Sequence, residues 1–204
     1  MDEITIKEPS LAEEKVLASR FIAILFPCVS VEEFETLLTK IKKDYPKATH
    51  YCYAYRLQKE EGFSDDGEPS RSVGLPLLSL LRGKGLSRVG FVVVRYFGGT
   101  KLGLGRLKRV YLEVASKALE GAPLFAVIPA VKLLLESDYS SYERIKKEAL
   151  LRGYSLGEES FSSSVRFSLL LDGTLIKQFE ETMSPSVTIL TRTDNEIILR
   201  SLPQ

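Results

Sequence analysis

The sequence has few of the residues that disulfide, metal and redox chemistry use. Its 204 residues include two cysteines, Cys28 and Cys52, one histidine, His50, and no tryptophan. A disulfide-stapled secreted domain uses more cysteines, so we expect reduced thiols and a cytoplasmic protein. The longest apolar run, residues 21–31, is interrupted by Pro27 and falls short of the roughly 20 residues that cross a bilayer. We therefore expect no membrane contact.

The chain also lacks a strong excess of either charge. The formal net charge is +1, and residues 1–125 hold 19 Lys/Arg against 16 Asp/Glu. Residues 126–204 hold 9 against 11, so the second part is slightly acidic. The long-range field of the protein is weak, and any site for an anion must be a local patch.

The first part of the chain alternates strand-like and helix-like segments. Apolar and β-branched runs predict strands over residues 4–6, 15–26, 50–57 and 89–97. Helical spacing predicts helices over residues 30–45, 76–81 and 102–119. Ser30 followed by Glu33 is a capping-box pattern, which places the start of the first of these helices.

The second part of the chain has a different order of elements. Strands are expected at 130–136, 154–158, 163–171, 186–192 and 196–201, and helices at 140–152 and 174–182. The order β-α-β-β-α-β suggests a ferredoxin-like sandwich. We expect an α+β protein with domains over residues 1–125 and 129–204, because Pro123 and Pro129 mark the boundary.

The segment over residues 95–111 has the strongest functional pattern. It contains five cations, four glycines and no acidic residue, namely Arg95, Gly98, Gly99, Lys101, Gly103, Gly105, Arg106, Lys108 and Arg109. A glycine-rich turn lets backbone N–H groups approach an anion, and the helix N-terminus that follows favours negative charge. Helical spacing places Leu104, Leu107 and Tyr111 on one face and Arg106 and Arg109 on the other. We expect a site for an anion or a nucleic acid.

Established phosphate motifs do not match this segment. A P-loop is absent, and the pattern that begins at Gly103 lacks the third glycine of the dinucleotide fingerprint, so we expect no cofactor. The alternative is a solvated helix face with Arg109 paired to Glu113. Cations at a helix N-terminus oppose its dipole by about 0.3–1 kcal/mol each, which favours the functional interpretation.

The loop before this segment is acidic. Five carboxylates lie within residues 60–68, and three of them, Asp65, Asp66 and Glu68, have oxygens that suit Mg²⁺. We favour a solvated loop that turns at Asp66-Gly67 and caps the next helix with its hydroxyls. No metal site is expected. Asp65, Asp66, Glu68, Ser70 and His50 are kept as a possible functional loop.

His50 opens a strand rich in tyrosine. It is a conceivable general base, and Cys52 shares its side of the strand because side chains alternate with period two. A hydrogen-bonded structural histidine is the favoured alternative. Tyr51, Tyr53 and Tyr55 share the opposite face. They would stack nucleobases if exposed, and we favour a place in the core.

Four blocks of this sequence resemble, in order, the signature blocks of the IMPACT/YigZ family. They are residues 19–23, 48–56, 64–70 and 95–103. The resemblance implies a ribosomal-protein-like βαβ first domain, with a mixed sheet and helices on one face. The second domain is similar to the C-terminal domain of bacterial YigZ-type members and to a terminal domain of elongation factor G. Arg71 and Arg106 stand where the family is expected to have glycine, and they add two phosphate-binding side chains.

The resemblance also implies a link to translation. Eukaryotic IMPACT proteins regulate the kinase pathway that restrains initiation, by competing for that kinase's protein activator. We therefore expect a non-catalytic, translation-linked factor that binds RNA or ribosome-associated components through the basic segment and Arg71. The alternatives are a protein-interaction module in translation control and a metal-dependent hydrolase or phosphotransferase that uses Asp65, Asp66 and Glu68. The resemblance assigns no catalytic residue.

Overall fold

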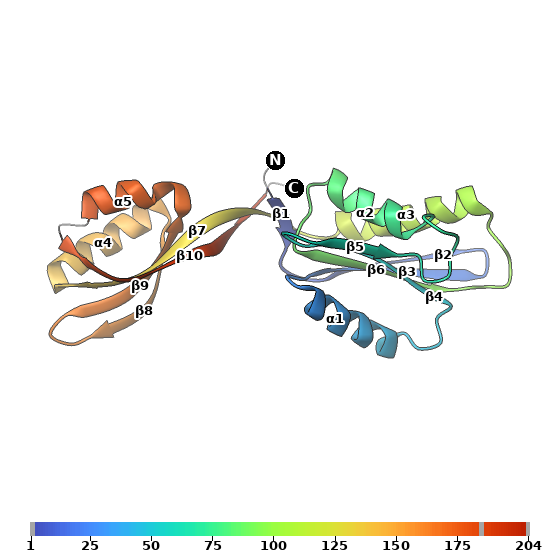
Figure 1. The fold of residues 1–204 in the computed structure, drawn as a ribbon, viewed down its shortest axis with the longest axis horizontal. Helices are drawn as coiled ribbons and strands as arrows, with labels where there is room; N and C mark the ends of the chain where they lie inside the picture. Colours follow the sequence, from blue (N-terminus) through green and yellow to red (C-terminus); the bar gives the residue numbers. More distant parts are fainter. Residues whose placement is uncertain (1–2, 184–185, 203–204) are drawn as a thin grey trace. The chain divides into compact units, whose positions relative to one another are not determined.

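The computed structural model describes residues 3–183 and 186–202, and it separates the chain into two compact units. The domains expected over residues 1–125 and 129–204 include residues 1–2 and 203–204, which lie outside the described residues. The first unit extends to Ala126 and includes Ser201, whereas the second is Val127–Arg200. Each unit has its own sheet and helices, labelled in Figure 1.

The first unit is built around a five-stranded sheet in the order β2-β3-β6-β4-β5. The strands of this sheet are β2 (Ser10–Val16), β3 (Ser19–Pro27), β4 (His50–Arg56), β5 (Glu61–Ser64) and β6 (Val89–Tyr96), whereas β1 (Glu3–Ile6) lies outside it. Every neighbouring pair in this sheet is antiparallel, so the expectation of a mixed sheet is wrong. The reason is that β6 lies between β3 and β4 and runs antiparallel to both, which keeps these two parallel strands from pairing.

Helices cover both faces of this sheet, and the expectation of helices on one face is also wrong. The helices are α1 (Val31–Asp44), α2 (Gly74–Gly83) and α3 (Leu104–Glu120). Phe34 of α1 packs with Val92 and Val94 of β6, whereas α2 and α3 pack on the other face through residues such as Leu77 and Tyr111. Figure 1 shows the sheet between α1 and the pair α2 and α3. A strand buried on both faces is apolar throughout.

The predicted start of α1 is confirmed. The Ser30 side chain accepts a hydrogen bond from the Glu33 N–H at 3.2 Å, and the Glu33 carboxylate accepts one from the Val29 N–H at 2.8 Å. The single strand expected over residues 15–26 is wrong, because β2 and β3 form a hairpin that turns after Val16. Leu17, in that turn, has a φ of 54°, in the left-handed region.

The second unit has the expected β-α-β-β-α-β order. Its elements are β7 (Leu124–Ser137), α4 (Tyr139–Arg152), β8 (Ser155–Phe161), β9 (Val165–Asp172), a 3₁₀ turn (Gly173–Leu175), α5 (Ile176–Met183) and β10 (Thr188–Ser201). Strand β9 lies between β7 and β8, and β10 pairs with β7. Tyr142 of α4 and Phe179 of α5 pack with Phe167 of β9 in one core. The two strands expected over residues 186–201 are one strand, and the ferredoxin-like assignment stays a prediction.

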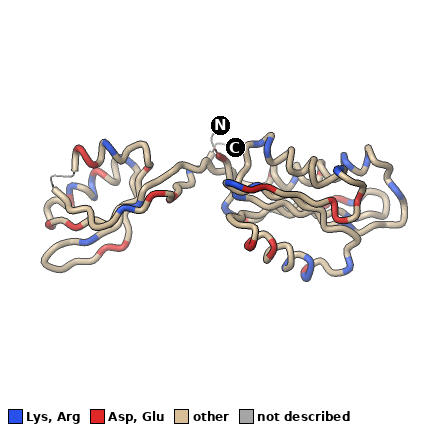
Figure 2. Tube along the Cα trace, in the orientation of Figure 1, with Lys and Arg blue, Asp and Glu red and all other residues tan. Residues whose placement is uncertain are grey.

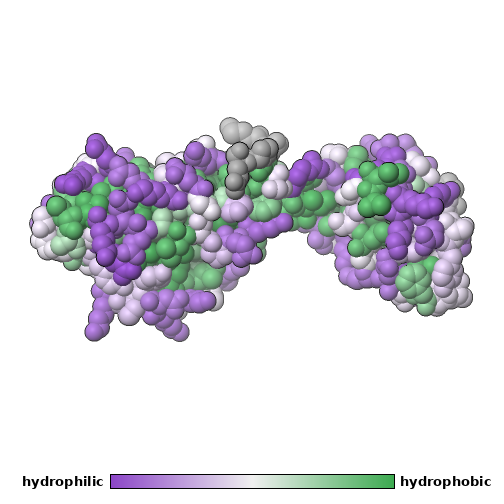
Figure 3. Space-filling view, turned by 180° about the vertical axis from the view of Figure 1, so that it is seen from behind, coloured by the Kyte–Doolittle hydropathy of each residue, from purple (hydrophilic) through white to green (hydrophobic). Residues whose placement is uncertain are grey.

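The surface of each unit carries both hydrophilic and hydrophobic residues, as Figure 3 shows for one side of the molecule. Leu150 and Leu151 at the end of α4 are 85% and 82% exposed. Within the part of the chain that the structure describes, no helix is long and apolar enough to span a membrane.

Replacing Ser30 with alanine is expected to lower the free energy of unfolding by about 1 kcal/mol, because the first turn of α1 loses its side-chain acceptor. Chemical denaturation of the full chain measures the change. Ser79→Ala is the matched control, since the Ser79 hydroxyl only donates to the Leu75 carbonyl inside α2. Equal losses in the two variants would contradict the role of Ser30.

Candidate functional site

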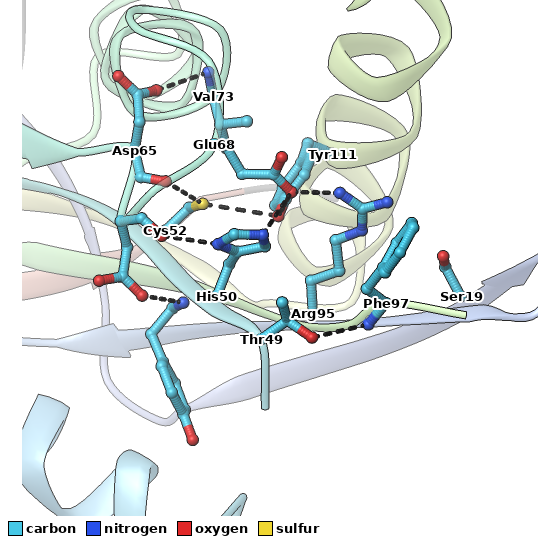
Figure 4. Close-up of polar contacts among 12 residues, drawn as sticks. Ser19, Thr49, His50, Cys52, Asp65, Glu68, Val73, Arg95, Phe97 and Tyr111 are labelled. Carbon is cyan, nitrogen blue, oxygen red and sulfur yellow. Dashed lines mark hydrogen bonds and ion pairs between the residues drawn. The ribbon is translucent and has the colours of Figure 1, made fainter. Parts of the chain in front are cut away.

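The candidate site lies where β4, β6, the loop between β5 and α2, and the start of α3 come together. His50 and Arg95 are register partners on β4 and β6. Glu68 lies in the loop after β5, and Tyr111 lies on α3. Figure 4 shows these four side chains turned toward one another. The acidic loop and the basic segment, which lie about 30 residues apart in the sequence, are therefore neighbours in the fold.

A buried carboxylate is the centre of this cluster. One oxygen of Glu68, Oε1, accepts hydrogen bonds from Arg95 Nη1 at 2.5 Å and from the Tyr111 hydroxyl at 2.8 Å. The side chains of Glu68 and Arg95 are each only 5% exposed. Arg95 therefore lies in the interior, not on the surface expected of a phosphate ligand. Burial also raises the pKa of Tyr111 and keeps it a hydrogen-bond donor.

The Arg95 guanidinium also contacts two aromatic rings. Its carbon lies 5.2 Å from the ring centre of Phe21 and 5.2 Å from that of Phe97. Both distances are within the range of a cation–π contact. Within the described residues, Arg95 Nε has no hydrogen-bond partner. The contacts fix the guanidinium, which in turn supports one face of the Phe97 ring.

His50 is oriented by the backbone of the acidic loop. Its Nδ1 lies 2.7 Å from the carbonyl oxygen of Asp66, and a carbonyl oxygen can only accept, so Nδ1 carries the proton. The other ring nitrogen, Nε2, lies 3.8 Å from Glu68 Oε1. The Asp66 carboxylate accepts from the Tyr51 N–H at 2.6 Å. The favoured interpretation of His50, a hydrogen-bonded residue of the fold, agrees with this geometry.

Asp65 holds the start of α2 from a distance along the chain. Its carboxylate accepts hydrogen bonds from the N–H groups of Arg71, Val73 and Gly74 at 2.6–2.9 Å. The expectation that hydroxyls of the loop cap this helix is wrong, since Ser72 Oγ is buried with no hydrogen-bond partner among the described residues. A carboxylate can accept several N–H groups at once, as a helix start requires.

The arrangement of Asp65, Asp66 and Glu68, the three carboxylates considered as metal ligands, does not suit a metal ion. Asp65 and Asp66 accept backbone N–H groups, and Glu68 is paired with Arg95. Their oxygens are thus directed at protein donors instead of converging on a common point. In residues 3–183 and 186–202, no group of three His, Cys, Asp or Glu side chains could hold a metal ion. The hydrolase alternative loses its proposed ligands.

Cys52 lies beside His50 but has the properties of a structural thiol. It is fully buried, and its Sγ donates to the carbonyl oxygen of Asp65 at 2.9 Å. Burial raises the pKa of the Cys52 thiol to about 12. A nucleophilic cysteine needs a thiolate near neutral pH, so the arrangement does not support a Cys–His catalytic pair. The tyrosines on the other face of β4 pack against the core, as favoured.

The cations after Arg95 lie on the surface. Lys101, Arg106, Lys108 and Arg109 are all exposed, and none of them forms an ion pair with a carboxylate of the described residues. The alternative pair between Arg109 and Glu113 is therefore not formed. Figure 2 shows blue residues along the start of α3 and the loop before it.

The glycines of this segment serve different purposes. Gly98 packs against Ala18, whose backbone would lie 2.1 Å from an added Cβ, so Gly98 is required by the close approach of two chain segments. Gly99 and Gly103 have positive φ angles of 86° and 77° and open space beside them. Gly103 is the N-cap of α3, which has neither a side-chain cap nor an acidic residue in its first turn. Gly105 follows in that turn, also with open space around it.

Arg71 joins these cations from the other side of a groove. Arg71 and Lys108 both line a groove of about 480 Å³ between α2 and α3. Arg71 has a φ of 56°, which explains why glycine is expected at this position of the family. Ser70, beside it, is exposed. The fold thus brings Arg71 near α3, a proximity that its sequence position alone does not reveal.

A cleft of about 420 Å³ opens where the two predicted segments meet. Its lining residues come from the start of β4, the loop before α2, the end of β6 with the loop that follows it, and the start of α3. They are Thr49, His50, Glu68, Pro69, Arg95, Phe97, Lys101, Leu102, Gly103, Leu104 and Leu107. Sequence reasoning missed Thr49 and Phe97. The Thr49 side chain accepts from the Phe97 N–H at 3.0 Å. Leu104, expected on the buried face of α3, is 60% exposed at this cleft.

The Glu68→Ala variant is expected to lose about 3–5 kcal/mol of unfolding free energy, because it leaves the buried Arg95 without its counter-charge. Urea denaturation of the full chain measures this loss. Glu60→Ala removes an exposed carboxylate of the same loop and should change stability by less than about 0.5 kcal/mol. If the two variants were equally stable, the buried pair would not have the role described.

Both cysteines are expected to resist alkylation at pH 8 in the folded protein. Cys28 and Cys52 are buried, and burial raises their pKa values to about 11 and about 12. Mass spectrometry after treatment with iodoacetamide should find neither thiol modified, and both modified in denaturant. Rapid labelling of Cys52 in the native state would restore the case for a reactive thiol.

Comparisons with known proteins point to one family. The model of the Impact N-terminal domain matches residues 17–119. An IMPACT family member from Thermus thermophilus is 42% identical over 155 residues, which cover 75% of this chain and 84% of that protein. YigZ of Escherichia coli is 34% identical over 148 residues, which cover 70% and 72%.

One solved structure extends the likeness to both units. It is described as a hypothetical protein, is 25% identical, and aligns with a TM-score of 0.62 over 96% of this chain and 100% of its own. With a family model that covers half of the sequence and a 42% identical relative aligned over most of both chains, this chain belongs to the IMPACT family.

Proposed function

We propose that this chain is a non-catalytic, translation-linked regulatory factor that binds RNA through the start of α3. The link to translation comes from the family, whose eukaryotic members act on the control of initiation. RNA is proposed as the partner because a phosphate backbone is a regular array of anions, which exposed Lys and Arg side chains recognise without reading sequence.

One observation carries the proposal. Four exposed cations lie within nine residues, Lys101–Arg109, and no carboxylate of the described chain neutralises them. They surround a helix N-terminus with no side-chain cap, where the helix dipole and free N–H groups attract anions. Arg71 adds a fifth cation across the groove that it shares with Lys108.

The acidic loop has a different part in this proposal from the one it would have in a protein-interaction module. Asp65, Asp66 and Glu68 accept hydrogen bonds from the protein itself. They are therefore not free to pair with a basic surface of a partner. The basic segment, by contrast, keeps its charge on the surface, which favours a polyanion over an acidic-and-basic protein surface as the partner.

The double variant Lys108→Ala/Arg109→Ala tests this proposal. Each phosphate that the protein no longer neutralises should make the slope of log affinity against log salt shallower by about 0.7 for single-stranded RNA, so the double variant should be shallower by about 1.4. Fluorescence anisotropy with a labelled single-stranded RNA at several salt concentrations measures the slope.

The matched control is Lys40→Ala/Lys43→Ala on α1, which removes the same charge from exposed positions on the other face of the sheet. This control should keep the slope of the unmodified protein. The proposal would be overturned if the unmodified protein did not bind RNA at low salt. It would also be overturned if the two double variants changed the slope by equal amounts.

A further inference from the structure

The cleft of about 420 Å³ has features that RNA backbone binding does not use. It lies within the size range of small-ligand pockets, and it combines three different kinds of wall. One end has backbone donors and a lysine, one side is apolar and aromatic, and the base is the buried cluster around Glu68. Each wall matches one part of a nucleotide.

The first wall suits a phosphate group. Lys101, Gly103 and Leu104 line the cleft, and the N–H group of Leu104 has no acceptor within the described chain, because α3 begins there without a side-chain cap. The charged groups of the lining are Arg95 and Lys101 against Glu68. Since Arg95 and Glu68 neutralise each other, Lys101 leaves the cleft with one net positive charge.

The second wall suits a flat ring. Phe97 is 40% exposed and Leu104 is 60% exposed, and both line the cleft together with Leu102. The Arg95 guanidinium lies 5.2 Å from the Phe97 ring centre, so the ring is supported from within the protein. A supported aromatic ring with an accessible face is the platform on which nucleobases stack.

The third wall offers hydrogen bonds of both kinds. Thr49 Oγ1 accepts from the Phe97 N–H at 3.0 Å, and its own proton remains available to a ligand. His50 carries a proton on Nδ1, which donates to Asp66, and in this tautomer Nε2 is the acceptor of the ring. A ribose hydroxyl or the edge of a base satisfies such a pair.

We propose that the cleft binds a nucleoside monophosphate unit, with the phosphate at Lys101 and the start of α3 and the base on Phe97. The unit has two sources, a free nucleotide or the phosphorylated end of an RNA. The second source rests on the proposed function, since the cations along α3 would hold the rest of that RNA.

Isothermal titration of the full chain with UMP, uridine and inorganic phosphate tests the inference. UMP is expected to bind at least about tenfold more tightly than uridine or phosphate alone, a factor that corresponds to about 1.4 kcal/mol. Equal affinity for UMP and uridine would show that the cleft does not bind the phosphate. Equal affinity for UMP and inorganic phosphate would show that Phe97 does not bind the base. Either result overturns the inference, as does the absence of UMP binding.

Leu104→Glu is the most direct variant. A carboxylate in the first turn stabilises a helix through its dipole, so the variant should fold at least as well as the unmodified chain while repelling the phosphate. We expect UMP affinity to fall by about tenfold or more. Leu11→Glu, at a 54% exposed position on β2, introduces the same charge away from the cleft and should leave UMP affinity unchanged. Equal affinities in the two variants would contradict the proposed position of the phosphate.

A pair of RNAs separates this inference from the proposed function. A linear RNA with a 5′ phosphate and a circular RNA of the same sequence present the same backbone, and only the first has an end. Binding of both RNAs without UMP binding would overturn the nucleotide site and leave RNA binding in place. Binding of UMP without either RNA would overturn the proposed function alone. Preference for the linear RNA, abolished in Leu104→Glu, supports both together.

Discussion

The ion pair between Glu68 and Arg95 is the constraint on which the rest of the first unit depends. Two opposite charges in a protein interior are tolerated only when each is paired and hydrogen-bonded, because both have lost their water. Arg95 comes from the central strand and Glu68 from a loop, and Tyr111 of α3 donates to the same oxygen. Three segments that are distant in the sequence are therefore fixed around one oxygen atom.

This constraint gives the acidic loop and the basic segment different environments. Asp65, Asp66 and Glu68 of the acidic loop are directed at the protein itself, where they hold the start of α2, the first strand residues of β4, and Arg95. The cations that follow β6 face solvent without partners in the described chain. A protein with a net charge of only +1 thereby presents a locally basic surface. Local arrangement, and not total charge, sets the electrostatic character of this site.

The parts of the fold that depend on neighbouring residues could be predicted from the sequence. Ser30 and Glu33 lie three residues apart and mark the start of α1 as expected, and the tyrosines of β4 alternate with its buried residues.

Contacts across long separations were not predictable. The loop before α2 shows this, because Asp65 caps a helix that begins nine residues later. The presence of helices on both faces could have been predicted, since the apolar run of β6 has no polar side. The sheet order was not predictable because β6, which follows α2 in the sequence, lies between the earlier strands β3 and β4.

Arg71 illustrates how a surface charge is linked to backbone shape. Its φ of 56° belongs to a conformation that disfavours L residues by roughly 1–2 kcal/mol. Glycine adopts that conformation freely but makes the unfolded chain more disordered. Relatives with glycine here would have a relaxed turn and a less basic groove, whereas this chain retains a guanidinium on a strained one. At this position, one backbone angle thus links the strain of a loop to the positive charge that the loop carries.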